Sequence, residues 1–470
     1  MSMVVQHNMQ AANANRMLGI TSGAQAKSTE KLSSGYKINR AADDAAGLTI
    51  SEKMRKQIRG LDKASSNAQD GVSSVQTAEG ALTEVHSMLQ RMNELAVQSA
   101  NGTNSSDDRQ AIQDEVDQLT TEIDRVAETT KFNEIYLLKG DNSNTKNVYM
   151  KGHDAGLKGT LTDGAKSATF TMDALQAGDK YTIAGKEYTI GSATTEVTAL
   201  IDKANTDATA DRANKTVDVN GKTYTITYNA AGNTIADADG TAITLDNLKK
   251  AVTGGSKVTY GNTSLTAMTD ADTDGVDDDD SSIITKDVAE TKIKAELLTA
   301  NNIGTVDQAA TVEDANTANG KTSYTINKGY ATVADTLSFN LHVGADADMT
   351  NKITVDIDTM NSANLGIKGI NVKDASGTEA TYAIDAIADA VAKVSSQRSA
   401  LGAVQNRLEH TIDNLDNISE NTSSAESRIR DTDMAKEMVN YSKNNILAQA
   451  GQSMLAQANQ SNQGVLSLLQ

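Results

Sequence analysis

The 470-residue chain contains no proline, no cysteine and no tryptophan. At a usual proline frequency of about 5%, a chain of this length would carry about 23 prolines, so the absence reflects selection. Proline breaks helices, and its slow isomerisation delays folding, so a chain without proline refolds without that delay. Without cysteine, neither disulfides nor thiolate metal sites can stabilise the fold, and stability must come from packing.

Charge and composition also narrow the partners that we expect. The chain carries 43 basic and 62 acidic residues, a formal net charge of −19, which argues against nucleic acid because phosphate contacts need a basic surface. Three phenylalanines and no tryptophan leave few platforms for stacked bases or large cofactors. No stretch approaches a membrane span, and the first residues lack the basic and apolar regions of a signal peptide. We therefore expect no membrane insertion, and export by another route.

The sequence offers no catalytic constellation. Its five histidines are scattered and form neither a His-Glu-x-x-His motif nor a neighbouring pair: His7, His86, His153, His342 and His410. This spacing favours neither a zinc site nor a Ser/His/Asp triad, so we expect no catalytic residues and no enzyme. His86 and His410 fall in predicted helices, where a surface or seam position is the simplest interpretation.

Long amphipathic helices are predicted over residues 1–140 and 380–470. One apolar stripe has the alternating three- and four-residue steps of a coiled coil: Val75, Ala78, Leu82, Val85, Leu89, Met92 and Ala96. After a turn at residues 101–104, a second stripe follows at Ile112, Val116, Leu119, Ile123 and Val126. A third repeats every seven residues, at Ile387, Val394, Leu401, Leu408 and Leu415. Three stripes of equal period predict one helical bundle.

The outermost segments, residues 3–32 and 433–470, have a different texture. They are rich in Ala, Gln, Asn and Ser, and their apolar stripes are narrow. Such thin helices are not stable alone, so we expect them to pair with each other and with further copies of the same chain. The alternative is a solvated helix pair that packs only within one chain. The residues that we assign to subunit assembly are Met9, Leu18, Met438, Leu447, Met454, Leu455 and Leu469.

The middle of the chain predicts strands and turns. Tyr-Thr-Ile recurs at residues 181–183, 188–190, 224–226 and 324–326, and Gly-Lys closely precedes three of these repeats. Asn220-Gly221 between two strand patterns is a strong hairpin signal, because both residues tolerate positive φ. Helical patterns follow over residues 195–204 and 245–252, so we predict a diverged hairpin–helix repeat forming small α+β modules.

Two motifs in the middle resemble ligand-binding loops. Gly221-Lys222-Thr223 and Gly320-Lys321-Thr322 echo a phosphate-binding loop, but the glycine required five residues earlier is missing, so we interpret both as hairpin turns. Residues 270–281 match a calcium loop at several positions, with candidate ligands Asp270, Asp272, Asp274 and Asp278. Position twelve of that loop is Ser281 rather than a bidentate glutamate, and no helix is predicted before it. These departures favour the alternative, a solvated acidic loop without a cofactor.

Motifs near both ends closely resemble those of bacterial flagellin, the subunit of the flagellar filament. One runs from Leu32-Ser-Ser-Gly-Tyr-Lys-Ile-Asn-Arg40 to Glu52, and another covers residues 89–104. The resemblance returns at Ser427-Arg-Ile-Arg-Asp-Thr-Asp433 and over residues 446–460. It covers about half of the chain, all at the ends, and its motifs are specific. The middle resembles no family that we can name.

The resemblance implies an α+β multidomain fold. Paired N- and C-terminal helices would form a coiled-coil core and a helical bundle rod, with a β-rich α+β insertion between them. The implied domains are residues 1–42 with 433–470 for the core, 43–160 with 370–432 for the rod, and 161–369 for a variable, surface-exposed region. The implied partners are further copies of the chain in a helical homopolymer, a flagellar export chaperone and a cap protein. Secretion by type III export to the extracellular flagellum would pass the chain unfolded, and we infer that this passage accounts for the missing proline and cysteine.

Flagellins of many bacteria are also recognised by a vertebrate Toll-like receptor. The positions of this chain that match the recognised surface are Gln90, Arg91, Leu95, Ile112, Glu115 and Gln118. Arg91 and Glu115 offer charge-assisted hydrogen bonds, and we expect Leu95 to provide an apolar anchor. Subunit packing in the filament is the alternative and primary role for these residues, and both roles can hold because a monomer exposes what a filament buries.

The function that the resemblance implies is a structural subunit of the filament used for swimming. One alternative is a hook–filament junction protein, which shares the end helices. A second is a flagellin whose middle is a peptidase, which the missing His-Glu-x-x-His motif disfavours. A third is a calcium-dependent surface adhesin built on the middle region.

Overall fold

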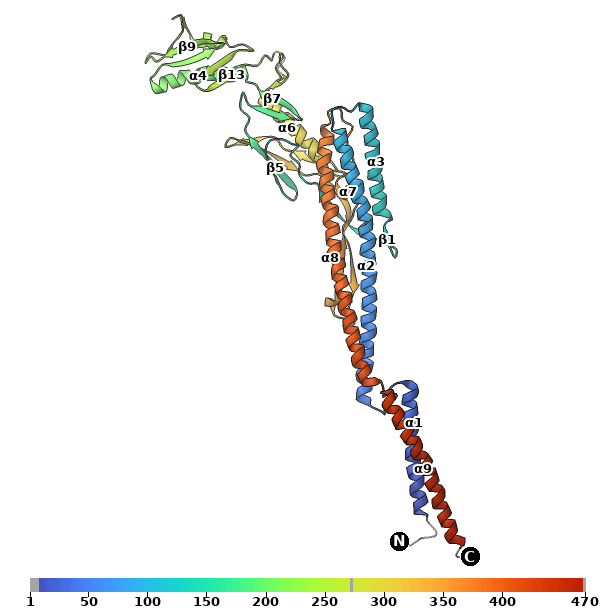
Figure 1. Ribbon diagram of the computed structural model, residues 1–470. Coiled ribbons are helices and arrows are strands. Elements are labelled where there is room, and N and C mark those ends of the chain that lie inside the picture. The colour runs from blue at the N-terminus through green and yellow to red at the C-terminus, as the bar shows by residue number, and fades with distance from the viewer. Residues whose placement is uncertain (1–7, 271–273, 468–470) are drawn as a thin grey trace. The chain divides into compact units, whose positions relative to one another are not determined.

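The computed structural model describes residues 8–270 and 274–467, with no account of the side chains of 462–467. The chain divides into two compact units. The first comprises the chain up to Val75, Phe339–Val355 and the chain from Gly402 onward. The second comprises Gln76–Ser338 and Asp356–Leu401. Helical ends enclose a β-rich middle in sequence, which confirms the predicted fold class (Figure 1).

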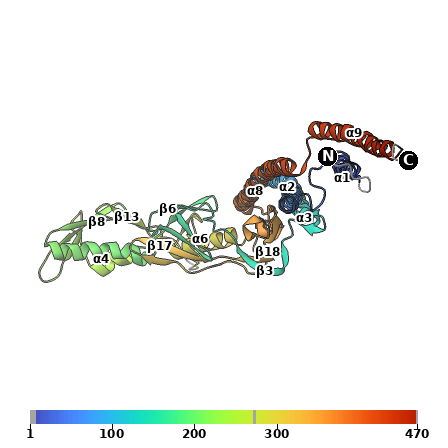
Figure 2. The same ribbon diagram turned by 90° about the horizontal axis from the view of Figure 1, so that it is seen from below.

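In the first unit, helix α1 (Met9–Ser34) packs along α9 (Met434–Ser467), and Figures 1 and 2 show the two side by side. The side chain of Asn8 caps α1 by accepting a hydrogen bond from the Ala11 main-chain N–H at 2.9 Å. The helix stops at Gly35, whose φ of +76° is left-handed and whose N–H donates to the Lys31 carbonyl. The pairing predicted between the two ends of the chain is therefore present.

Helices α2 (Ala45–Ser99) and α8 (Thr378–Arg430) contribute segments to both units. Within the first unit, Ala68 of α2 and Leu408 of α8 form an apolar cluster with Val343 and Ile353. The last two belong to the segment that contains β19 (Leu337–His342), η1 (Met349–Asn351) and β20 (Lys352–Ile357). A Cβ at Gly71 would lie 2.2 Å from Leu341 Cδ1, so a glycine on α2 allows this segment to approach closely.

In the second unit, α2 and α8 run beside α3 (Ser106–Thr129), as both views show (Figures 1 and 2). The predicted stripes are buried here: Leu82, Leu89, Ile123, Ile387 and Val394 have no exposed surface. The predicted bundle is confirmed. At the start of α3, Ser105 and Asp108 form a capping box, in which each side chain accepts a hydrogen bond from the main chain of the other.

Short elements follow the bundle helices in the second unit. Strands β1 (Lys131–Phe132) and β2 (Ile135–Tyr136) form a tight hairpin. Strand β3 (Asp141–Tyr149) pairs antiparallel with β18 (Tyr330–Asp335), although the two are far apart in sequence. Helix α7 (Ser362–Leu365) is held by Asp124 of α3, whose carboxylate accepts hydrogen bonds from the Ser362 N–H and hydroxyl.

The β-rich middle has two apolar cores. The first lies under a sheet of order β15-β17-β5-β4, with β16 on β17, and a sheet of order β14-β7-β6, together with α6 (Lys286–Asn301). The strands are β4 (Thr160–Asp163), β5 (Ser167–Asp173), β6 (Lys180–Ile183), β7 (Lys186–Ile190), β14 (Ile283–Ile284), β15 (Thr311–Val312), β16 (Asn316–Ala318) and β17 (Lys321–Asn327).

The second core lies between a sheet of order β11-β10-β9-β8-β12-β13 and the helices α4 (Thr194–Asp211) and α5 (Leu245–Lys250). Its strands are β8 (Lys215–Val219), β9 (Lys222–Thr227), β10 (Thr234–Asp237), β11 (Ala242–Ile243), β12 (Lys257–Tyr260) and β13 (Thr263–Thr266). Val217, Ile226 and Val258 of adjacent strands all point into this core.

The Gly-Lys sites are hairpin turns, as predicted. Each turn has two central residues with positive φ, the geometry of a type I′ turn, and the lysine begins the next strand. The central pairs are Ala184-Gly185, Asn220-Gly221 and Asn319-Gly320. In a phosphate-binding loop the lysine begins a helix. In all three turns here it begins a strand instead.

The hairpin–helix repeat is less regular than predicted. Helix α4 follows the β6–β7 hairpin and extends to Asp211, well past the predicted end at residue 204. A second hairpin, β10–β11, intervenes between β9 and α5, and α5 ends at Lys250 rather than at residue 252. Strand β18, not a helix, follows β17. The turn residues located the hairpins, but the helices that pack on the two cores follow different strands than the repeat predicted.

Among the helices of residues 8–270 and 274–467, none combines the length and the apolar character needed to cross a membrane.

Candidate subunit interface on the terminal helices

The contact between α1 and α9 is made mainly of small and polar residues, with one leucine from each helix. On α1 the half-buried positions recur every three or four residues and are Ala11, Ala14, Leu18, Thr21 and Ala24, followed by the buried Ser28. On α9 the half-buried positions include Asn444, Ala448, Gly451, Leu455 and Ala458. Leu18 Cδ1 would lie 3.4 Å from a Cβ at Gly451, so the leucine packs over the glycine. The Asn8 amide donates to the Ala458 carbonyl at 3.3 Å.

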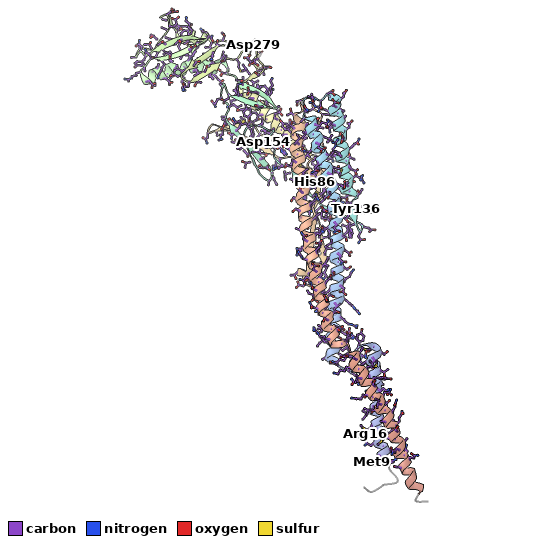
Figure 3. The ribbon with its side chains drawn as sticks, in the orientation of Figure 1. Met9, Arg16, His86, Tyr136, Asp154 and Asp279 are labelled. Carbon is purple, nitrogen blue, oxygen red and sulfur yellow. The ribbon has the colours of Figure 1, made fainter. Side chains whose placement is uncertain are left out.

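The outer faces of the same two helices carry large apolar side chains. Val439 is 68% exposed and Ile446 is 67% exposed, and Met9, marked in Figure 3, is 74% exposed. Others that are exposed are Met17, Ile20, Met434, Met438, Leu447 and Met454. We call this set the outer apolar face. Exposed large apolar side chains in this number mark an interaction site, because water solvates them poorly.

The structure separates the predicted assembly residues into two groups. Met9, Met438, Leu447 and Met454 lie on the outer apolar face, available to another chain. Leu18 and Leu455 are half-buried in the contact between α1 and α9, where they hold the pair together. Leu469 lies outside the described residues. The prediction missed Met17, Ile20, Val439 and Ile446, although the seven-residue spacing of Val439 and Ile446 in the sequence is a helical-face signal.

A polar joint holds the start of α9 against the end of α1. The Lys37 N–H donates to the Arg430 carbonyl at 2.6 Å, and the Thr432 N–H donates to the Gly35 carbonyl at 3.0 Å. The Arg430 guanidinium lies 4.8 Å from the centroid of the Tyr36 ring, a cation–π contact. Arg430 also bonds Glu52 of α2 at 2.8 Å. The segment after α1 and the segment before α9 are thus held together by these contacts.

The predicted receptor residues lie on α2 and α3 in the second unit. Gln90, Arg91, Glu115 and Gln118 are exposed. Arg91 Nε lies 2.9 Å from Glu115 Oε1, and this hydrogen bond raises the pKa of the Arg91 guanidinium. The pair joins the two helices across their surface.

Leu95 and Ile112 have a different place from the other receptor residues. Leu95 is 2% exposed and Ile112 is 7% exposed, because both belong to the bundle core. The anchor role that we predicted for Leu95 therefore does not fit this fold: the side chain cannot reach a partner without opening the bundle. The sequence pattern placed Leu95 near the apolar stripe, and its burial in the bundle decides its role.

The acidic loop uses its described carboxylates to stabilise turns. Asp270 accepts a hydrogen bond from the Gly275 N–H at 3.1 Å, and Asp274 accepts one from the Val276 N–H at 2.8 Å. The Asp278 N–H donates to the Thr269 carbonyl at 2.7 Å. Asp272 lies outside the described residues, and among those described no three His, Asp or Glu side chains are grouped as metal ligands. Calcium binding stays a prediction.

Taken together, a helical bundle, a β-rich insertion and terminal helices with an outer apolar face define a structural subunit that associates through its chain ends. Comparison with known proteins agrees with this class. The family model of the bacterial flagellin N-terminal helical region matches residues 5–143, and that of the C-terminal helical region matches residues 384–469. Flagellin of Clostridium tyrobutyricum is 40% identical over 467 residues, covering 98% of this chain and 100% of that protein. Flagellin B of Vibrio anguillarum is 35% identical over 471 residues, covering 100% of both chains. The chain therefore belongs to the bacterial flagellin family.

Solved structures give only a weak match. FliC from Burkholderia pseudomallei aligns with a TM-score of 0.29 and 18% identity, covering 72% of this chain and 99% of that chain. The flagellar junction protein FlgL from Legionella pneumophila aligns with a TM-score of 0.31 and 13% identity, covering 81% of this chain and 99% of that chain. Membership of the flagellin family makes the chain a structural subunit of the extracellular flagellar filament rather than a member of an enzyme family.

Proposed function

We propose that the outer apolar face of α1 and α9 is the main contact between subunits in the filament. The observation that carries this proposal is the distribution of side chains on the helix pair: apart from Leu18 and Leu455, the residues that face each other are mainly small or polar, whereas nine large apolar residues among those described are exposed. Repetition of one such contact between identical chains, without closure, gives a helical filament. Elongation of filament seeds by the wild-type chain and by a variant of this face tests it.

The wider organisation follows from the same proposal. Residues 1–42 with 433–470 form the inner core, 43–160 with 370–432 the surrounding rod, and 161–369 the surface-exposed region. In a monomer, exposed apolar helices need protection from premature association, which supports an export chaperone as a partner before secretion and a cap protein at the growing end. Export of the unfolded chain through a type III channel agrees with the absence of proline and cysteine.

The filament subunit is preferred to the alternatives. Relatives that match the full length of the chain carry the name flagellin, which favours the filament over a hook–filament junction role. A calcium-dependent adhesin depends on the acidic loop, in which the carboxylates of Asp270 and Asp274 already accept main-chain hydrogen bonds.

We further propose that a host Toll-like receptor binds the monomer at the exposed residues Gln90, Arg91, Glu115 and Gln118. Charged and amide groups at this surface offer charge-assisted hydrogen bonds to a receptor. Arg91→Ala with Glu115→Ala should weaken receptor binding by at least tenfold, because two charged partners are lost. Both side chains are largely exposed, so the folded monomer should keep its stability.

Surface plasmon resonance with the immobilised receptor ectodomain measures this effect. The control is Arg125→Ala with Glu122→Ala, a second exposed Arg–Glu pair on α3 outside the predicted surface. The control should bind as the wild type does. Equal affinity of the wild type and the Arg91/Glu115 variant would refute the receptor proposal and leave the filament proposal untouched.

A further inference from the structure

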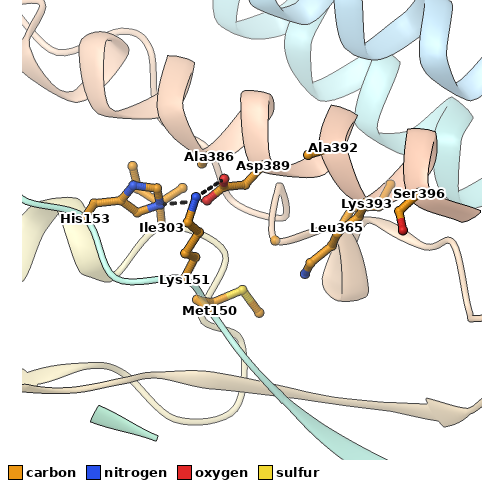
Figure 4. Close-up of a pocket in the computed structure, with 11 residues that line it drawn as sticks. Met150, Lys151, His153, Ile303, Leu365, Ala386, Asp389, Ala392, Lys393 and Ser396 are labelled. Carbon is orange, nitrogen blue, oxygen red and sulfur yellow. Dashed lines mark hydrogen bonds and ion pairs between the residues drawn. The ribbon is translucent and has the colours of Figure 1, made fainter. Parts of the chain in front are cut away.

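A cavity of about 320 Å³ opens in the second unit beside α8 (Figure 4). Ala386, Asp389, Lys393 and Ser396 line it from one face of α8, since they are spaced three or four residues apart. The opposite wall comes from the chain after β3, from Ile303 after α6, and from the end of α7: Met150, Lys151, His153, Ile303, Leu365 and Gly366. Its volume falls in the range of small-molecule sites, and its walls are mainly apolar.

The polar groups of the cavity are mostly basic, in a chain whose net charge is −19. Lys151 Nζ lies 2.9 Å from Asp389 Oδ1, and His153 Nε2 lies 3.5 Å from Asp389 Oδ2. These contacts are drawn in Figure 4. The negative charge of Asp389, the single carboxylate that lines the cavity, is therefore already compensated by the Lys151 ammonium.

Lys393 is the basic residue of the cavity that does not pair with Asp389. Its ammonium donates a hydrogen bond to the Asn364 carbonyl at 2.7 Å, and an ammonium has three N–H donors. Within the described part of the chain, no carboxylate lies within ion-pair distance of it. Burial lowers the pKa of Lys393, and the nearby charges of Asp389 and Asp358 only partly oppose that shift. A bound anion would offset this desolvation.

We propose that this cavity binds a small aliphatic monocarboxylate, with its carboxylate on the Lys393 ammonium and its alkyl chain against Met150, Ile303 and Leu365. A singly charged anion matches the one uncompensated ammonium. A phosphate dianion would need a second cation or a nest of main-chain N–H groups, and the lining offers an apolar wall instead. The site involves none of α1 or α9, so it goes beyond the filament function.

Isothermal titration of the full-length monomer with hexanoate tests the proposal, with hexanol and hexylammonium as probes of the same length. Hexanoate should bind at least tenfold more tightly than either, since a charge-assisted hydrogen bond corresponds to about tenfold or more in affinity. Lys393→Met should weaken hexanoate binding by a similar factor. Lys373→Met, which removes an exposed lysine of the same unit outside the cavity, should bind as the wild type does.

A second measurement does not depend on the folding of a variant. Wild-type monomer is treated with an acetylating reagent with and without hexanoate, and acetylation of each lysine is followed by mass spectrometry. Hexanoate should protect Lys393 and leave Lys373 unchanged. Equal binding of hexanoate and hexanol, or equal acetylation of Lys393 with and without hexanoate, would overturn the proposal.

Discussion

Buried polar side chains tie irregular chain to the bundle of the second unit. Arg109 of α3 is 5% exposed, and its guanidinium donates to the carbonyls of Ser99 and Ala375 at 3.2 and 3.0 Å. Gln113, one turn later, donates to the Ile370 carbonyl and accepts from the Val372 N–H. These two residues satisfy main-chain groups at the end of α2 and in the segment before α8, which no helix or strand pairs.

Replacement of Arg109 should show how much its hydrogen bonds to the main chain contribute to the free energy of unfolding. Arg109→Met removes the donor to the buried carbonyl of Ser99 and the part-buried hydrogen bond to the Ala375 carbonyl, so we expect the free energy of unfolding to fall by about 2–4 kcal/mol. Arg109→Lys should recover only part of the loss, because an ammonium cannot reproduce the planar fork of the guanidinium. Urea unfolding followed by circular dichroism measures both variants.

Arg125→Met is the matched control for this prediction. It lies on the same helix, is 60% exposed and pairs with Glu122 at the surface, so its loss should change the stability little. A midpoint for Arg109→Met equal to that of the control would mean that Arg109 does not fasten the segment around residue 375.

At the scale of elements, helix α3 depends on its N-terminal cap. The Asp108 carboxylate accepts hydrogen bonds from the Ser105 hydroxyl and N–H, and the hydroxyl bond, followed by the main-chain bond, lowers the pKa of Asp108 below 3.8. A carboxyl group whose pKa is lower when folded stabilises the fold above its unfolded pKa, and this contribution is lost as the pH falls through the folded pKa.

We therefore expect the first turn of α3 to open as the pH falls below about 4, with neighbouring turns unchanged in the same interval. Hydrogen exchange of the amides of residues 106–109 measures this, at a series of pH values corrected for intrinsic exchange. In Asp108→Asn the opening should become independent of pH in that interval, because the titrating group is gone. An acid-induced opening of the same size in that variant would assign the effect to another group.

The elements of this fold were largely predictable, since each depends on local pattern. The heptad stripes predicted α2, α3 and α8 and the buried Leu82, Leu89 and Val394. Positive-φ turn residues predicted the hairpins at Asn220-Gly221 and Asn319-Gly320. The short helix bounds were wrong at α4 and α5, where packing on the sheet of β8 to β13 decides how far each helix runs.

The sites were harder to predict, because they depend on which face of a helix remains uncovered. In the sequence, Leu95 cannot be told apart from an exposed apolar anchor, but in the fold it is buried. Val439 and Ile446 belong to a stripe that a sequence pattern would place in a core, and the small residues of α1 and α9 face each other instead. The joint at Tyr36 combines Arg55 and Arg430, which lie far apart along the chain and share no local signal.

At the scale of the whole molecule, the helical ends and the β-rich middle have different roles. The helical ends, matched by the flagellin family models, present the outer apolar face that we assign to assembly. The middle has two apolar cores and hairpins with tight turns, and the first core also receives Tyr382 of α8. The absence of proline over both parts agrees with transport of the entire chain unfolded.

The central claim is that chains associate through the outer apolar face, and seeded elongation tests it most directly. Purified monomer is added to short filament fragments, and growth is followed by light scattering and electron microscopy. Val439→Gln with Ile446→Gln changes two side chains that are exposed in the monomer, so its circular dichroism should match the wild type. Lys443→Gln, an exposed polar position between them on α9, is the control.

We expect the wild type and Lys443→Gln to extend the seeds at similar rates, and the Val439/Ile446 variant to extend them at least tenfold more slowly, because it loses two apolar contacts in every subunit. Failure of the wild type to elongate the seeds, or elongation by the Val439/Ile446 variant at the wild-type rate, would contradict the account.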